Sequence, residues 1–151
     1  MNGELERLVD EAAIGALLLR FADRLDAKDW EAYAATFADD GVFEIFGQQR
    51  VGRGAIAAGP ARDLTRFART QHYSVNHVIA VSGDEADARA SLLAVHIPDL
   101  SRPAEHADVG GVYHCTCLRT GEGWRFRHVR LEILWTAGTD FTAPDERSAE
   151  E

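Results

Sequence analysis

Two histidines have the residue type needed for acid–base chemistry. His72 and His77 lie five residues apart in RTQHYSVNHVIAVS, a run with the alternation of a β-strand. A neutral histidine takes up a proton near physiological pH, and a carboxylate bonded to its second nitrogen orients the ring and stabilises the imidazolium. Such a pair could catalyse an elimination, an isomerisation or an aldol-type cyclisation. None of these reactions needs a metal or an organic cofactor, so we expect neither.

The alternation of side chains along a strand separates the two histidines. Asn76 shares a face with His72, whereas Tyr73 shares the opposite face with His77. We therefore expect His72 and Asn76 to face a pocket and His77 to face away from it, unless a bulge intervenes. A zinc site formed by His72, His77 and His96 is arithmetically possible, but the same alternation opposes it.

Helices are predicted in the first half of the chain and strands in the second. The apolar positions of the first helix recur at helical spacing, and Asp29 is a plausible N-cap of the second. The predicted helical regions are 4–28, 29–37 and 52–69, the last interrupted at Gly59-Pro60. The predicted strands are 42–47, 72–82, 86–97, 112–120 and 124–138. This order favours an α+β domain in which helices cover one face of an antiparallel sheet and leave a conical apolar pocket.

Composition limits the classes of partner and compartment. The chain has 151 residues and a formal net charge of −9, which disfavours nucleic acid and anionic membranes as partners. We expect a single domain over residues 1–140, a flexible acidic tail over 141–151, and a small molecule as the ligand. Cys115 and Cys117 are poorly spaced for a disulfide, and the first residues do not read as a signal peptide, so a cytoplasmic location is predicted.

The order of the motifs resembles the SnoaL-like branch of the nuclear transport factor 2-like superfamily. IGALLLRFADRLDAKDWEAYAATFADDGVFEI is similar to the family's opening, with a helix ending in Asp-x-x-Asp-Trp, then Phe-x-Asp-Asp, then a strand. GRGAI resembles the turn into the third helix, TQHYSVNHVIAVSGDEADARASLLAVH the first long strand pair, and LRTGEGWRFRHVRLEILW the last hairpin. The resemblance covers about residues 5–137. It implies a cystatin-like α+β barrel, in which a curved, antiparallel-rich mixed sheet wraps around N-terminal helices.

Within this superfamily the site pattern resembles scytalone dehydratase, bile acid 7α-dehydratase and hexachlorocyclohexane dehydrochlorinase. In these enzymes a helix-end Asp pairs with a His on the first long strand, and the matching residues here are Asp26 and His72. His96 matches a second pocket histidine, which would act as a donor or as a second acid–base group. The tyrosine that precedes the Asp in scytalone dehydratase is Leu25 here, and the dehydrochlorinase's helix lysine falls near Phe21. The acid assistance of those enzymes is therefore not carried over.

The resemblance implies a cofactor-independent lyase (dehydratase) or isomerase that acts on a small apolar or polycyclic substrate. The catalytic residues would be His72, Asp26 and His96. Two alternatives remain open: a polyketide-cyclase-like enzyme, and a non-catalytic module that binds small molecules or serves in assembly. The residues expected to contact the substrate are Leu25, Phe21, Asn76, Leu92, Val129, Leu131 and Trp135.

A homo-oligomer, either a dimer or a trimer, is the expected assembly. Related domains usually associate through the outer face of the sheet. We predict that aromatic and histidine side chains lie on this face and are covered by a second subunit. They are Tyr73, His77, Trp124 and Phe126.

Overall fold

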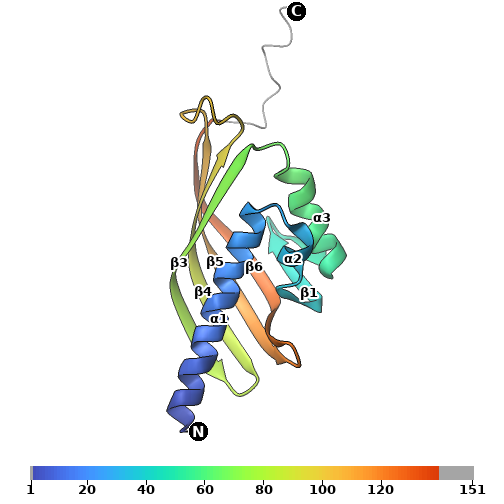
Figure 1. Ribbon diagram of the computed structural model, residues 1–151, viewed down its shortest axis with the longest axis vertical. Helices are drawn as coiled ribbons and strands as arrows, with labels where there is room; N and C mark the ends of the chain where they lie inside the picture. Colours follow the sequence, from blue (N-terminus) through green and yellow to red (C-terminus); the bar gives the residue numbers. More distant parts are fainter. Residues whose placement is uncertain (1, 140–151) are drawn as a thin grey trace, which may run out of the picture.

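A computed structural model describes residues 2–139, so the predicted tail at 141–151 lies outside the described residues. Three helices precede or interrupt a six-stranded sheet: α1 (Gly3–Asp26), α2 (Trp30–Ala34) and α3 (Arg53–Asp63). Figure 1 shows α1 lying across the long strands, with α2 and α3 gathered at one side next to β1. None of these helices combines the length and the apolar character needed to cross a bilayer.

The sheet is mixed and runs in the order β2-β1-β6-β5-β4-β3. Its strands are β1 (Phe37–Ile45), β2 (Gln48–Val51), β3 (Arg69–Ser82), β4 (Glu85–Ile97), β5 (Ala107–Thr120) and β6 (Gly123–Gly138). The pairing of β1 with β6 is parallel and the other pairings are antiparallel. The α+β fold class predicted from the sequence is therefore confirmed, with helices on the inner face of a curved sheet.

Three local predictions differ from the structure. Residues 38–41 were expected to separate the second helix from the first strand, but they are part of β1. Pro60 lies inside α3 and does not interrupt it, and α3 ends at Asp63, well before the predicted boundary. β2 was not predicted, because its residues, QQRV, lack the β-branched and aromatic enrichment of a typical strand.

The apolar stripe of α1 forms the core, as the helical spacing predicts. Phe21 lies at its centre, with ring centroids 4.9 Å from Tyr33, 5.2 Å from Tyr113 and 5.5 Å from Phe126. Phe21 is 2% exposed and does not line the pocket, so the structure does not support its predicted contact with substrate. The same holds for Val129, which is 1% exposed within this core.

A β-bulge in β3 overturns the prediction that His77 faces outward. Val75 pairs with Ser91 and Val78 with Arg89, so β3 has one extra residue in this interval. Asn76 has φ 54° and is exposed in the bulge, outside the cavity that holds His72. The alternation resumes with the opposite phase, and His77 turns to the inner face, where its Nε2 lies 2.9 Å from Ser74 Oγ.

A second bulge lies near the end of β6. Gly110 pairs with Trp135 and Gly111 with Ile133, which leaves Leu134 as the extra residue. Trp135 therefore moves to the outer face, where its ring lies so close over Gly110 that a Cβ there would be 2.1 Å from it. The predicted pocket position of Trp135 is wrong for this reason.

Two aromatic residues assigned to the outer face belong to the core. Trp124 is 5% exposed and Phe126 is fully buried. A further bulge in β6 explains the difference, because Thr116 pairs with His128 and Cys117 with Phe126, which leaves Arg127 as the extra residue. The phase of β6 reverses there, so Trp124 and Phe126 point inward as Val129 does, and α1 covers them. Cys115 and Cys117 are also buried, as free thiols, and burial raises the pKa of both. Thiols with raised pKa values are poor nucleophiles, so burial assigns both cysteines to packing.

Candidate active site

Asp26 and His72 form a partly buried hydrogen-bonded pair between the end of α1 and β3. His72 Nδ1 lies 2.6 Å from Asp26 Oδ1, and the backbone N–H of His72 donates to Oδ2 at 2.8 Å. Thr70 Oγ1 donates to Oδ1 at 2.9 Å. A carboxylate only accepts hydrogen bonds, so the network assigns the proton to Nδ1 and leaves the lone pair of Nε2 available.

The residue Lys28, just after α1, binds the end of this helix to the segment before β3. Lys28 follows the helix in the left-handed conformation, with φ 56°, where glycine is usual. Its ammonium group donates to the carbonyl oxygens of Phe67 and Thr65, in the segment that leads into β3. The helix end and the start of the strand that carries His72 are therefore tied together.

His96 lies beside His72 on the neighbouring strand β4. The two ring centroids are 5.6 Å apart and the rings meet edge to face. His96 Nδ1 lies 3.2 Å from the carbonyl oxygen of Ala107, so this nitrogen donates and Nε2 is again the acceptor. Burial, and then the neighbouring His72, lowers the pKa of His96 below its ordinary value. In this neutral tautomer the free ring nitrogen of His96 accepts a hydrogen bond and does not donate one.

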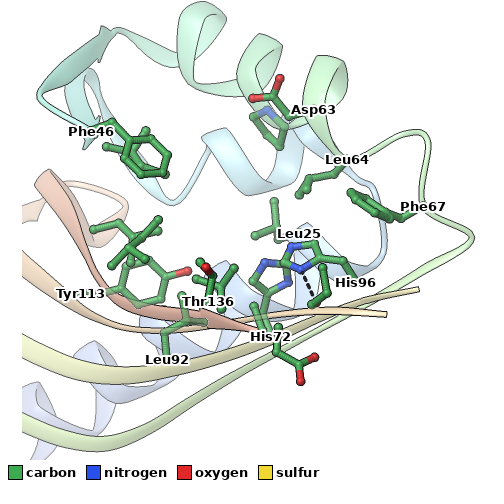
Figure 2. Close-up of a pocket in the computed structure, with 18 of the residues that line it drawn as sticks. Leu25, Phe46, Asp63, Leu64, Phe67, His72, Leu92, His96, Tyr113 and Thr136 are labelled. Atoms are coloured by element: carbon green, nitrogen blue, oxygen red, sulfur yellow. Dashed lines mark hydrogen bonds between the residues drawn. The ribbon is translucent and has the colours of Figure 1, made fainter. Parts of the chain in front are cut away.

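The histidines line a cavity of about 690 Å³ between the sheet and α3. In Figure 2, Asp63 and Leu64 lie on the helix side, and His72, Leu92 and Tyr113 lie on the sheet side. The volume is in the usual range for small-molecule sites. Of the predicted contact residues, three line this cavity: Leu25, Leu92 and Leu131.

Two tyrosines in the lining were missed by the sequence analysis. Tyr33 comes from α2 and Tyr113 from β5, and the Tyr113 hydroxyl points into the cavity (Figure 2). Burial raises the pKa of both phenols well above the ordinary value, so both are neutral donors. The alternation of Tyr113 with Cys115 and Cys117 could have indicated that Tyr113 faces inward.

Further charged residues of the cavity lining were also missed. They are Arg50 on β2, Asp63 at the end of α3, and Arg66, with Asp108 on β5. Arg50 Nη2 lies 3.3 Å from Asp63 Oδ2, and Asp108 Oδ1 lies 2.7 Å from His106 Nδ1. The Phe46-Gly47 turn could have indicated the position of Arg50, because a hairpin closed at this turn places Arg50 opposite the inward-facing Phe43.

A curved mixed sheet closed by helices over one apolar cavity defines a small α+β protein of the cystatin-like, nuclear transport factor 2-like class. Residues 6–130 match the SnoaL-like domain, and the chain belongs to this family. The resemblance stated from the sequence is therefore confirmed at the level of family and fold.

Solved structures agree with this assignment. A putative scytalone dehydratase from Novosphingobium aromaticivorans DSM 12444 is 27% identical over 89% of this chain and 90% of its own, with a TM-score of 0.79. A protein with a cystatin-like fold from Nostoc punctiforme PCC 73102 is 29% identical over 83% and 91%, with a TM-score of 0.71. A type 2 hexachlorocyclohexane dehydrochlorinase, LinA, is 21% identical over 95% and 99%, with a TM-score of 0.79, and shows the shared fold alone. No curated protein is significantly similar in sequence.

Proposed function

We propose that the protein is a cofactor-independent lyase or isomerase in which His72 is the general base and Asp26 orients it. The observation that carries the proposal is the 2.6 Å contact between His72 Nδ1 and Asp26 Oδ1 at the wall of an apolar cavity. The scytalone dehydratase likeness supports a dehydration, and the apolar lining supports a small apolar or polycyclic substrate.

In an elimination, His72 Nε2 takes the proton from a carbon next to a carbonyl group. The C–H electron pair becomes the new C=C bond, and the leaving oxygen departs with the C–O pair. Asp26 stabilises the imidazolium that forms, as the carboxylate of a triad does. In an isomerisation, His72 returns the same proton to a different carbon. Base assistance of this kind contributes about 10²- to 10⁴-fold.

The leaving oxygen, or the enolate oxygen, needs a proton or a hydrogen-bond donor. Tyr113 is the best candidate, because it is neutral and its hydroxyl points into the cavity that His72 lines. His96 is a poor candidate, because its donor nitrogen is directed at the Ala107 carbonyl. Tyr113 would therefore replace the tyrosine that is Leu25 here.

Two other functions are compatible with the family. A polyketide-cyclase-like enzyme would use the same base for an aldol-type ring closure. A non-catalytic binding module would be favoured by an exposed or unpaired His72, but the side chain is 7% exposed and bonded to Asp26. The pairing of His72 therefore supports the catalytic proposal over the binding module.

The test measures whether the protein catalyses the exchange of ketone α-protons for deuterium in deuterated water. Cyclic ketones such as 2-tetralone are incubated with the protein, and loss of the α-proton signal is followed by NMR. We expect exchange to fall about 100-fold or more in His72→Gln and Asp26→Asn. His77→Gln is the matched control, because His77 lies on the same strand but outside the cavity lining. Equal exchange by His72→Gln and the wild type would refute the proposal, and bound ketone without exchange would favour the binding module.

A further inference from the structure

Arg50 places a guanidinium group in the wall of an apolar cavity. It pairs directly with Phe43 across β1 and β2, so both side chains lie on the same face of the sheet. The Arg50 Cζ atom lies 5.6 Å from the centroid of the Phe43 ring. Both residues line the cavity that holds His72.

The position of this guanidinium is set by α3. A Cβ at Gly59 would lie 2.0 Å from Arg50 Nη1, so the group rests directly on the helix backbone where only glycine leaves room. Arg50 is 23% exposed in its side chain, and Asp63 accepts from it at 3.3 Å.

The charge of Arg50 is only partly balanced by Asp63. The Asp63 carboxylate makes shorter contacts with Arg62, at 2.8 Å and 3.1 Å, outside the cavity lining. A guanidinium has five N–H donors in a planar fork, and the contact with Asp63 engages one nitrogen. The remaining donors match the geometry of a carboxylate or another anionic oxygen group.

Arg50 and the histidines line one cavity from different parts of the sheet. β2 and β3 are the two edge strands of the sheet, and Arg50 comes from the first while His72 comes from the second. Much of the lining is apolar, and it includes Leu25, Phe43, Leu92, Leu131 and Ile133. A ligand in the cavity meets this apolar lining together with a base and a cation that come from the two edge strands.

We infer that Arg50 forms an anion subsite, and that the substrate class is an apolar ring compound with a carboxylate or similar anionic oxygen group remote from the reacting carbon. The reaction in this statement rests on the proposed function, whereas the subsite itself is a binding property. Tyr33 also lines the cavity and adds a neutral donor near Arg50. Its phenol is buried, which raises its pKa, and the nearby charge of Arg50 acts in the opposite direction.

The subsite is tested with two fluorescent probes that differ by one anionic group. They are 8-anilinonaphthalene-1-sulfonate and its neutral parent, N-phenyl-1-naphthylamine. Titrations at about pH 8 keep ordinary histidines neutral, so that Arg50 is tested apart from the dyad. We expect the preference for the anionic probe to fall about tenfold in Arg50→Gln, since charge-assisted hydrogen bonds are lost. Arg127→Gln is the matched control, because Arg127 pairs with Glu85 and does not line the cavity.

Asp63→Asn separates a binding role from a structural one. If Arg50 only ties β2 to α3, Arg50→Gln and Asp63→Asn break the same contact and change probe binding in the same direction. If Arg50 binds anions, Asp63→Asn removes the competing carboxylate and raises the anionic preference. Gly59→Ala is a further check, because the added methyl group displaces the guanidinium while the arginine is kept, and it should lower the preference.

The result that overturns the inference is an unchanged anionic preference in Arg50→Gln, or a lowered one in Asp63→Asn. Loss of the preference in Arg66→Gln instead of Arg50→Gln would place the subsite elsewhere and overturn it too. Repeating the titrations in His72→Gln keeps the two proposals apart. A preserved preference there, with unchanged ketone exchange, would leave the anion subsite standing and remove the proposed function.

Discussion

Tyr113 is the residue to which the proposed function gives the role of proton or hydrogen-bond donor. Tyr113→Phe keeps the ring, so the aromatic contacts around Phe21 are preserved and the fold is expected to remain. We expect elimination from a cyclic β-hydroxy ketone, followed by the absorbance of the conjugated product, to slow about 10- to 100-fold, since one positioned donor is lost. Tyr73→Phe on the outer face is the control and should leave the rate unchanged. An unaltered rate in Tyr113→Phe would assign the donor role to another group.

His96 makes folding stability depend on pH. Burial and the neighbouring His72 lower its pKa in the folded state, while Asp26 and Asp108 act weakly in the opposite direction. As pH falls below the ordinary value of 6.5, the unfolded chain takes up a proton at this residue before the folded chain does. The unfolded state then binds more protons, so stability is lost as pH falls and is fully present above the ordinary value.

The measurement is thermal unfolding of the wild type and of His96→Gln between about pH 7.5 and about pH 5.5. The wild type should lose melting temperature over this range, and His96→Gln should lose less. Acidic groups whose pKa values are lowered, such as Asp10 and Asp63, titrate below this window and do not mask the difference. An equal loss of melting temperature in the wild type and in His96→Gln would contradict the assignment of this pH dependence to His96.

Residue-level chemistry was predictable where an element kept its regular period. The family resemblance indicated Asp26 and His72, and the face of His72 followed from the alternation because β3 is regular up to Val75. Asn76 and Trp135 could not be placed, because each lies at a bulge. A bulge adds one residue and reverses the phase of every later side chain, and neither the Asn76 nor the Leu134 position has a sequence feature that indicates one.

At the scale of elements, Lys28 connects α1 to the segment before β3. It occupies a left-handed position that costs a non-glycine residue about 1 kcal/mol or more, and its ammonium group holds the Phe67 carbonyl. Phe67 in turn packs against His96, with ring centroids 5.1 Å apart. Lys28 is therefore a positioning residue for the two strands that carry the histidines.

Two substitutions separate the backbone and side-chain roles of Lys28. Lys28→Met keeps the strained conformation and loses the hydrogen bond, so it should destabilise the protein by about 1–2 kcal/mol. Lys28→Gly loses the same bond but relieves the strain, so it should recover about 1 kcal/mol of this loss. Denaturant unfolding measures both. Amide exchange in the segment 64–69 should rise in both variants, and unchanged exchange there would show that Lys28 does not hold this segment.

At the scale of the whole molecule, the order of helices and strands was enough to predict the α+β class. It did not predict that β1 joins the sheet in parallel beside β6, because the two strands are separated by most of the chain. Arg50 was missed for a related reason, since its place in the cavity depends on β2, which has no strand-like composition. Such long-range pairings are tertiary properties, and local patterns carry little information about them.

The outer face of the sheet has an apolar row that suits self-association. Tyr73 on β3 pairs with Leu93 on β4, Leu93 pairs with Gly110 on β5, and Trp135 on β6 covers Gly110. Tyr73 is 47% exposed, Leu93 is 40% exposed and Trp135 is 49% exposed. We expect a dimer or trimer that buries this row, although three of the four residues first assigned to this face do not lie on it: His77 turns to the inner face, and Trp124 and Phe126 are in the core.

Leu93→Glu places a charge at the centre of the row and should convert the oligomer to a monomer, because a buried unpaired carboxylate costs several kcal/mol at an interface. Light scattering after size-exclusion chromatography gives the mass directly. Leu19→Glu is the control, since Leu19 is exposed on α1, away from the outer face of the sheet. The cavity lies on the inner face, so probe binding should survive in the monomer. A wild-type chain that is monomeric at about 100 μM, well above a micromolar dissociation constant, would contradict the predicted assembly.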